Sequence, residues 1–225
     1  LFDCLEFSDE LATIDILYDF AFLLMDLEHR GLSDLANAAA NRYLDLTDDD
    51  EGLAALPLFL SVRAAIRAHV TAAAVNHDGL PSDLANQIAE ARSYFDNART
   101  VLNPQPCRLI AIGGLSGSGK STIARELAPL LGTRPGARIL RSDVIRKRLH
   151  GVMPESPLPN TAYGPDTSRR VYDSLCAKAN VALEAGYTVI IDSVALREEE
   201  RRSFVAVATK ARVPFLGIWL EVSAQ

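Results

Sequence analysis

The chain has 225 residues, of which 48% are hydrophobic and 23% are charged, as in an ordinary globular protein of one large or two small domains. Its three cysteines are far apart and show no C-x-x-C spacing, which argues against a disulfide framework or a zinc site. No signal peptide is visible, so we expect a cytoplasmic protein with no membrane partner. The apolar stretch 14–27 is too short, and too often interrupted by aspartate, to span a bilayer.

Charge is divided unevenly along the chain, although the net charge is only −6. Residues 1–103 carry 18 acidic and 6 basic side chains, whereas residues 104–225 carry 11 acidic and 17 basic ones. This division predicts two modules. The basic module suits a polyanionic nucleotide, or a phosphorylated or nucleic-acid acceptor. An equally favoured interpretation is that the opposite charges help the two modules to dock.

Helical periodicity dominates the first part of the chain after a short strand-like segment. The predicted helices span 9–30, 33–46, 53–76 and 82–102, and Pro57 favours a later start for the third. Asp48-Asp49-Asp50-Glu51 is predicted to be a solvated loop, with a metal site there as the less favoured alternative.

Asn103-Pro104-Gln105-Pro106 is the predicted linker, because two prolines in three positions resist helix and sheet. We therefore expect a helical module over 1–102, a linker over 103–106 and a second domain over 107–225. In that domain strands and helices alternate, which predicts an α/β fold with a doubly wound parallel sheet. The predicted strands span 108–112, 137–141, 187–191 and 215–222, and the predicted helices span 119–131, 143–150, 166–185 and 197–211.

A phosphate-binding P-loop stands between the first predicted strand and helix of this domain. The segment Gly114-Leu115-Ser116-Gly117-Ser118-Gly119-Lys120-Ser121 matches G-x-x-x-x-G-K-[ST] without a mismatch. Glycines let backbone N–H groups surround phosphate oxygens, and the helix N-terminus adds partial positive charge. We expect Lys120 to reach the β- and γ-phosphates and Ser121 to ligate Mg²⁺. The predicted nucleotide contacts are Gly114, Leu115, Ser116, Gly117, Ser118, Gly119, Lys120, Ser121 and Thr122.

Two carboxylates follow later strands of the predicted sheet. Asp192 ends the apolar strand Val189-Ile190-Ile191, and ligands of such sheets bind at the carboxyl ends of strands. We favour a Mg²⁺-holding role for Asp192 over the alternative of a capping residue. Asp143 follows another strand and either contacts and deprotonates an acceptor hydroxyl or caps the next helix. Arg146, one helical turn on, is a candidate for binding a phosphate or carboxylate of the acceptor, as are Arg169 and Arg170 with less support.

These three segments together resemble the AAA-type P-loop kinases, the group that includes the zeta-toxin, polynucleotide kinase and gluconate kinase families. The resemblance covers about 107–225 and rests on Leu115–Thr122, Arg141–Arg146 and Val189–Asp192. It implies ATP-dependent phosphoryl transfer to a hydroxyl, with Lys120, Asp143 and Arg146 in catalysis and with ATP and Mg²⁺ required. The lid arginines and the adenine contact of that family would lie beyond Gln225, so the resemblance implies that residues 1–225 lack part of that family's catalytic machinery.

The first module resembles the C-terminal lobe of aminoglycoside phosphotransferase-like proteins. The resemblance rests on Leu1–Phe7 and Ile14–Asp19, covers about 1–100, and places Asp3 at that family's metal-binding aspartate. The catalytic-loop aspartate and the nucleotide-binding lobe have no counterpart, which implies a scaffold role for these helices. The chain begins without Met and inside an apparent strand, and it stops just after another, so we expect a piece of a longer protein.

The function predicted from these observations is transfer of the γ-phosphoryl of Mg-ATP to a hydroxyl acceptor, for which a small molecule is favoured over a nucleic acid. A GTPase switch is disfavoured, because no D-x-x-G follows Lys120 and no N-K-x-D occurs in the chain. A nucleotide-binding regulatory module or an ATPase without an acceptor remains the alternative. No motif in the loop 151–165 names the acceptor.

Overall fold

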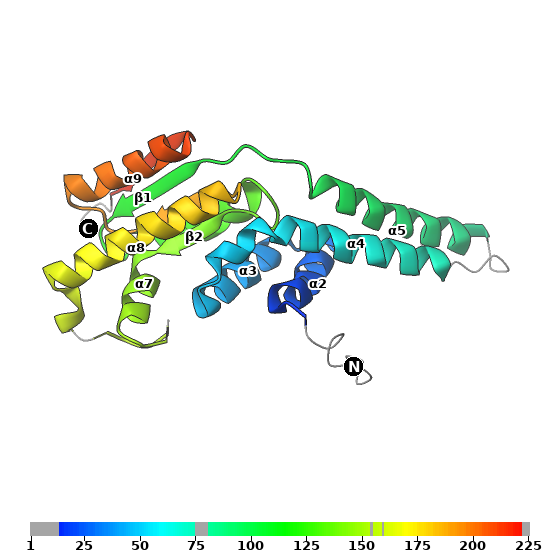
Figure 1. Ribbon diagram of the computed structural model, residues 1–225, viewed down its shortest axis with the longest axis horizontal. Coiled ribbons are helices and arrows are strands. Elements are labelled where there is room, and N and C mark those ends of the chain that lie inside the picture. The colour runs from blue at the N-terminus through cyan, green and yellow to red at the C-terminus, as the bar shows by residue number, and fades with distance from the viewer. Residues whose placement is uncertain (1–13, 75–80, 154, 159, 222–225) are drawn as a thin grey trace. The chain divides into compact units, whose positions relative to one another are not determined.

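The computed structural model describes residues 14–74, 81–153, 155–158 and 160–221, and Figure 1 shows the order of their helices and strands. By their contacts the described residues group into two compact units. One unit is drawn from 1–32 and 55–103, and the other from 33–54 and 104–225. Residues 33–54, which lie within the helical module expected from the sequence, thus group with the residues after the linker. None of the described helices is long and apolar enough to cross a membrane.

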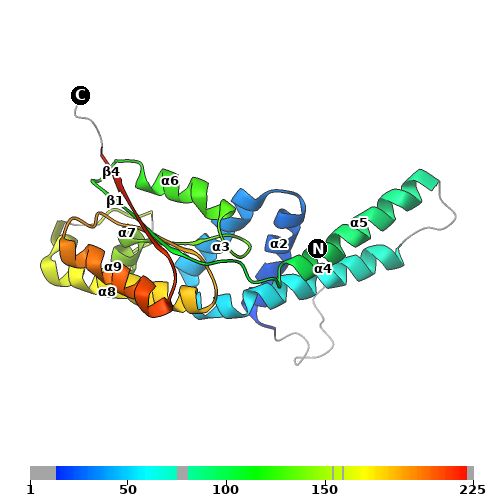
Figure 2. The ribbon, with the colours of Figure 1, turned by 90° about the horizontal axis from the view of Figure 1, so that it is seen from above.

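The first unit consists of helices α2 (Ile16–His29), α4 (Leu56–Ala73) and α5 (Pro81–Thr100). Asp15 caps α2 by accepting a hydrogen bond of 2.8 Å from the Leu17 amide. Helices α4 and α5 lie side by side along their length (Figures 1 and 2), and the Ser61 hydroxyl on α4 donates to the Ala98 carbonyl on α5. As Pro57 suggested, α4 starts at Leu56, because proline is tolerated in a first turn.

The second unit is built on a four-stranded sheet in which every pair of neighbours is parallel. Its strands are β1 (Leu109–Gly114), β2 (Arg138–Arg141), β3 (Val189–Asp192) and β4 (Phe215–Leu220), in the order β2-β3-β1-β4. The register pairs Ile112 with Asp192 and Arg141 with Asp192, so the carboxyl ends of β1, β2 and β3 meet at one edge. The predicted α/β fold with a parallel sheet is confirmed.

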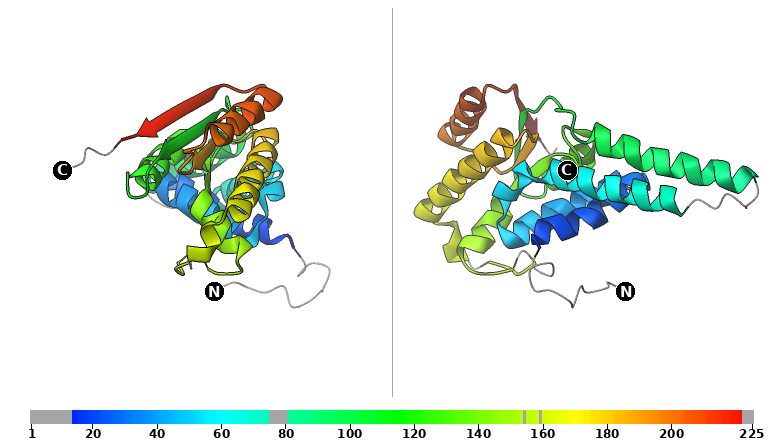
Figure 3. Two further views of the ribbon diagram at one scale, coloured as in Figure 1. Left: turned by 90° about the vertical axis from the view of Figure 1, so that its left-hand side faces the viewer. Right: turned by 45° about the vertical axis from the view of Figure 1, so that its right-hand side comes forward.

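Helices cover both faces of this sheet, as a doubly wound fold requires. Helix α6 (Lys120–Leu127) covers one face, and α8 (Pro165–Glu184) and α9 (Glu198–Ala211) lie side by side over the other (Figures 2 and 3). The short helix α7 (Ser142–Leu149) starts where β2 ends and packs against α8. The 3₁₀ turns η2 (Ala128–Leu130) and η3 (Asn160–Tyr163) follow α6 and lie in the long loop, respectively.

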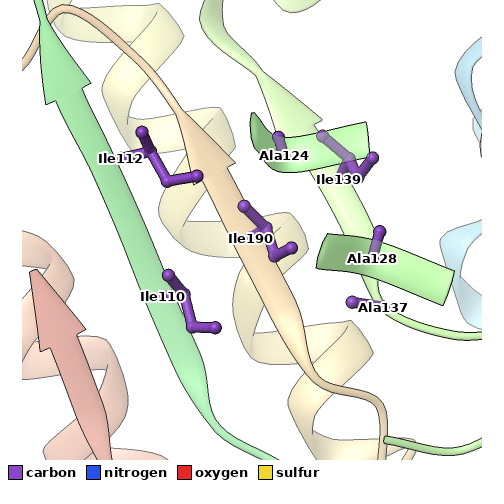
Figure 4. Close-up of a cluster of buried hydrophobic side chains, with 7 residues drawn as sticks. All are labelled: Ile110, Ile112, Ala124, Ala128, Ala137, Ile139 and Ile190. Atoms are coloured by element: carbon purple, nitrogen blue, oxygen red, sulfur yellow. The ribbon is translucent and has the colours of Figure 1, made fainter. Parts of the chain in front are cut away.

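The core between the sheet and α6 combines branched strand residues with small helix residues. Ile110, Ile112, Ile139 and Ile190 project from the three strands toward α6 and η2, which meet them with alanines (Figure 4). The small side chains of Ala124 and Ala128 let the helix approach the sheet closely, and both are fully buried. This packing fixes the start of α6, and with it the P-loop, over the carboxyl ends of β1 and β3.

The outer edge of β2 is covered by α3 (Ser33–Thr47), not by another strand. Asn41 accepts a hydrogen bond of 2.7 Å from the Ile139 amide, and the side-chain amides of Asn37 and Asn41 both donate to the Ala137 carbonyl. Two asparagines therefore satisfy backbone groups that an exposed strand edge would leave to water or to another chain. Gly136 makes the approach possible, because a Cβ there would lie 2.8 Å from Asn37 Nδ2.

Opposite charges hold η1 (Asp50–Ala54) and the end of α3 to the sheet. Arg138 on β2 is only 3% exposed and forms ion pairs of 2.6 Å with Asp50 and 2.7 Å with Asp45. Lys178 on α8 pairs with Asp48 and Asp50. The prediction that the acidic run is simply a solvated loop is therefore wrong: Asp50 is buried, and the run serves as a docking segment for basic side chains. No group of three possible metal ligands occurs there or elsewhere among the described residues.

Candidate nucleotide-binding and catalytic site

The P-loop joins the end of β1 to the start of α6 in a conformation that requires glycine. Gly114, Gly117 and Gly119 have φ values of 140°, 81° and 88°, which side chains rarely adopt. At Gly114 a Cβ would also lie 2.6 Å from the Leu220 carbonyl oxygen of the neighbouring strand. Gly119 immediately precedes α6 in the left-handed conformation, so the free amides of the first helical turn face the loop. The sequence prediction of a strand, a glycine loop and a helix is thus found in the structure.

The side chain of Lys120 folds back across the P-loop toward the end of β1. The side chain is almost buried, and its Nζ donates hydrogen bonds of 2.8 Å to the Gly114 carbonyl and 2.7 Å to the Leu115 carbonyl. An ammonium group has three donor hydrogens, so a phosphate oxygen inside the loop could accept the third. The hydroxyl of Ser118, also in the loop, is buried and has no hydrogen-bond partner. A buried orphan donor beside a lysine fits an anionic ligand that accepts from both.

Ser121 and Asp192 are brought together by α6 and β3. The Ser121 hydroxyl donates a hydrogen bond of 2.5 Å to Asp192 Oδ2, and Asp192 is 6% exposed. A hydroxyl and a carboxylate in contact beside phosphate-binding amides are oxygen ligands of the kind that Mg²⁺ takes together with substrate phosphates. The two residues named from the sequence for Mg²⁺ therefore meet, and their chemistry fits that ion.

Arg141 lies beside Asp192 in the candidate site, although the sequence alone did not assign it a role. It ends β2 opposite Asp192, and its Nε lies 3.7 Å from Asp192 Oδ2. This Nε is buried and makes no hydrogen bond. The signal that could have identified it is its position, since Arg141 directly precedes the Ser142-Asp143 pair at the end of a predicted strand.

Asp143 and Arg146 lie on α7, and among the described residues neither forms a hydrogen bond or ion pair with Lys120, Ser121 or Asp192. Asp143 is in the first turn, half-exposed, and pairs with Lys147 at 2.9 Å. Arg146 is buried, donates to the Ala162 carbonyl at 2.9 Å and stacks its guanidinium 4.9 Å from the centre of the Tyr163 ring. Arg146 thus holds the end of the long loop against α7, while Asp143 stays accessible at the carboxyl end of β2. Their roles toward an acceptor remain predictions.

The segment after Asp192 is held in place by Tyr172 of α8. The Ala195 amide donates a hydrogen bond of 2.9 Å to the Tyr172 hydroxyl, and Ala195 has a φ of 47°. Burial raises the pKa of Tyr172, even though the hydrogen bond from Ala195 opposes that shift. The phenol therefore stays protonated at neutral pH and supports the segment that follows Asp192.

Comparisons with known proteins agree with this description. A family described as AAA domain matches residues 109–225. Three mycobacterial proteins are each 34% identical to the chain over 196 residues: uncharacterized protein Mb2027c of Mycobacterium bovis, and uncharacterized proteins MT2060 and Rv2004c of Mycobacterium tuberculosis. The matched region covers 85% of this chain and 38% of each relative, so the chain spans well under half the length of these curated proteins.

A solved structure of a mutant of the Mycobacterium tuberculosis APS kinase CysC is similar with a TM-score of 0.38 and 19% identity. That similarity covers 55% of this chain and 80% of the other. The family match takes in the P-loop, Asp192 and the whole parallel sheet, and it spans more than half of the chain. The protein therefore belongs to the AAA domain family, which its residues 109–225 match.

Proposed function

We propose that this chain carries the ATP-binding and phosphoryl-transfer site of a kinase that acts on a hydroxyl group. The observation that carries the proposal is the contact of 2.5 Å between Ser121 and Asp192 beside a P-loop whose lysine is almost buried. Family membership supports nucleotide binding. That no D-x-x-G follows Lys120 and that no N-K-x-D occurs in the chain supports ATP over GTP. We propose that the domain belongs to the group of P-loop kinases that includes the zeta-toxin, polynucleotide kinase and gluconate kinase families.

Each side chain has a defined task in this proposal. The Lys120 ammonium offsets phosphate charge, and the amides of the P-loop hold the phosphate oxygens in position. Ser121 and Asp192 would hold Mg²⁺, which supplies charge neutralisation at the transferring phosphoryl group. Asp143 accepts the proton of the attacking hydroxyl, a task for which a half-exposed carboxylate at the end of β2 is suited.

The role of residues 1–102 is a separate part of the proposal. We propose that they derive from the C-terminal lobe of aminoglycoside phosphotransferase-like proteins and serve as a scaffold. Asp3 and the segment Leu1–Phe7, on which the resemblance partly rests, lie outside the described residues. The helices of the first unit and the docking of residues 33–54 on the sheet are consistent with a scaffold.

Release of ADP by the full-length protein, in the presence and absence of hydroxyl compounds, tests the proposed function. Lys120→Ala should reduce release by at least about a hundredfold, because a preorganised charge at the phosphates is lost. Lys210→Ala changes an exposed lysine in the last turn of α9 and is the matched control. Equal rates for the two variants would show that the site is misassigned. ATP binding without any acceptor-dependent release would favour the regulatory alternative.

A further inference from the structure

A cavity of about 640 Å³ lies in the second unit, between α3, α6 and the carboxyl end of β2. Cavities of roughly 300–1,000 Å³ are typical of sites for small molecules. We call it the α3 pocket, because α3 supplies Asp34, Asn37, Ala38 and Arg42 as one of its walls. The inference developed from it rests on the proposed kinase function and concerns the acceptor.

The α3 pocket opens onto the candidate catalytic site. Ser121, which contacts Asp192, and Arg141, whose Nε lies 3.7 Å from the same carboxylate, are both part of its lining. Val144, the residue after Asp143, lines it as well. A molecule in this pocket would therefore lie next to the residues that are expected to hold Mg²⁺ and the transferring phosphoryl group.

The wall that α3 contributes is firmly held. Asn37 and Asn41 are engaged with the backbone of residues 137 and 139, so their polar groups are not available to a ligand. The ion pair between Arg138 and Asp45 also holds the end of α3. Ala38, by contrast, is exposed and lines the pocket without a polar group, which leaves room for an occupant.

The lining of the α3 pocket has no excess of positive charge, because its three arginines are met by four carboxylates. Of its charged residues, Arg42 pairs with Glu155 at 2.6 Å, and Asp45 pairs with Arg138 at 2.7 Å. Two carboxylates remain, Asp34 and Glu126, and among the described residues neither forms an ion pair. Arg125 and Arg141 line the same pocket, and Arg141 also pairs with Asp192. A polyanion such as a nucleic acid needs an excess of positive charge, which this lining does not provide.

We propose that the α3 pocket binds the phosphoryl acceptor and that this acceptor is a small, electrically neutral molecule with several hydroxyl groups. Hydroxyls donate to carboxylates and accept from guanidinium groups, so a neutral polyol matches a lining of both. In the reaction a bond forms between an acceptor hydroxyl oxygen and the γ-phosphorus of ATP, and the bond from that phosphorus to the β–γ bridging oxygen breaks. The hydroxyl proton passes to Asp143, and the products are ADP and a phosphate monoester.

The test measures acceptor-dependent ADP release by the full-length protein with three probes: a neutral hexose set, a ribonucleoside set and a 5′-hydroxyl oligonucleotide. We expect stimulation by a neutral small molecule and none by the oligonucleotide. Ala38→Leu, which fills the pocket from α3, should raise the KM of the stimulating probe about tenfold or more and change the KM of ATP less than twofold. Asp34→Asn, which adds no bulk, should also raise the KM of the probe.

Ala206→Leu is the matched control, because Ala206 is an exposed residue inside α9 that lies away from the α3 pocket. It should leave both KM values unchanged. Three results would overturn the α3 pocket assignment: only the oligonucleotide stimulates ADP release, no probe stimulates it, or Ala38→Leu leaves the KM of the stimulating probe unchanged. Calorimetry with a non-hydrolysable ATP analogue distinguishes failure of the pocket assignment from failure of the proposed kinase function. If the unaltered protein does not bind the ATP analogue, the proposed kinase function itself is wrong.

Discussion

Ser121 and Asp192 form the most informative pair of residues in the candidate site. They lie 71 positions apart in the chain, yet the parallel sheet brings the start of α6 and the end of β3 to one edge and leaves the hydroxyl 2.5 Å from the carboxylate. Both were predictable from the sequence, because a P-loop and a strand-terminal acid each have a known place in such a sheet. Arg141 was not predictable in the same way, because its approach to Asp192 depends on the register of β2 against β3.

Asp192→Asn should remove the benefit that Mg²⁺ gives to nucleotide binding, because the amide is a weaker ligand without charge. With Mg²⁺ the affinity for a non-hydrolysable ATP analogue should fall about tenfold or more, and in EDTA it should change little. Isothermal titration calorimetry under both conditions measures this. Asp173→Asn, an exposed position on α8, is the control. An undiminished effect of Mg²⁺ in Asp192→Asn would remove Asp192 from the metal site.

At the scale of elements, the edge of β2 is where sequence reasoning and structure differ most. The pattern of apolar residues predicted most strands and helices within a few positions, because periodicity reports the buried face of each element. The first helix is an exception: it was predicted from residue 9 but begins at Ile16, where Asp15 caps it. It did not predict that α3 covers β2 through Asn37 and Asn41, since asparagines in a helix give no periodic signal. The acidic run was misjudged because isolated charge runs are usually solvated, whereas Asp50 meets Arg138 and Lys178.

Asp50→Asn should destabilise the protein, because it leaves Arg138 buried with one of its two carboxylate partners missing. Breaking a buried ion pair typically costs about 3–5 kcal/mol, and urea unfolding at pH 7 measures the loss. Glu51→Gln, an exposed neighbour, should change the free energy of unfolding by no more than about 0.5 kcal/mol. Equal stabilities for the two variants would contradict the assigned role of Asp50.

The ion pair of Asp50 and Arg138 also predicts that the stability of the protein depends on pH. Burial alone raises the pKa of Asp50, but the charges of Arg138 and Lys178 outweigh burial and hold that pKa below its ordinary value. Stability from such a group is complete above the pKa of the unfolded chain, about 3.9, and is lost as the pH falls through the lower folded value. The difference in unfolding free energy between Asp50→Asn and the unaltered protein should therefore be constant near pH 7 and shrink below about pH 4. A difference that grows with acidity would contradict this assignment.

Asn41→Ala should open the edge of β2. It removes the acceptor of the Ile139 amide and one donor to the Ala137 carbonyl, and an unsatisfied buried group costs about 1–3 kcal/mol. Amide hydrogen exchange should show faster exchange at Ile139, while Ile190 in the central strand β3 stays protected. Unchanged protection of Ile139 would mean that α3 does not close this edge.

At the scale of the whole molecule, the uneven distribution of charge has a partial structural explanation. Acidic residues before the linker pair with basic residues after it, as Asp45 and Asp50 do with Arg138 and as Asp48 does with Arg148. These ion pairs attach residues 33–54 within the second unit, and docking of the two units through opposite charges stays a prediction. A boundary placed only at the linker would separate residues that the structure groups together.

A chain that begins at residue 104 should therefore be less stable than the chain of 225 residues, because Arg138 loses both carboxylate partners and β2 loses its cover. The deficit should be about 3 kcal/mol or more in urea unfolding. Adding a peptide that spans residues 33–54 should recover part of it. A shortened chain with the same unfolding midpoint, unaffected by the peptide, would show that this segment is dispensable.

Binding of Mg-ATP by the P-loop can be measured by calorimetric titration. The unaltered protein would be titrated with non-hydrolysable analogues of ATP and GTP in the presence of Mg²⁺, beside Lys120→Ala. We predict micromolar binding of the ATP analogue, much weaker binding of the GTP analogue, and loss of ATP binding in the variant. Preference for GTP, or equal ATP binding by Lys120→Ala, would show that the P-loop is not the proposed Mg-ATP site.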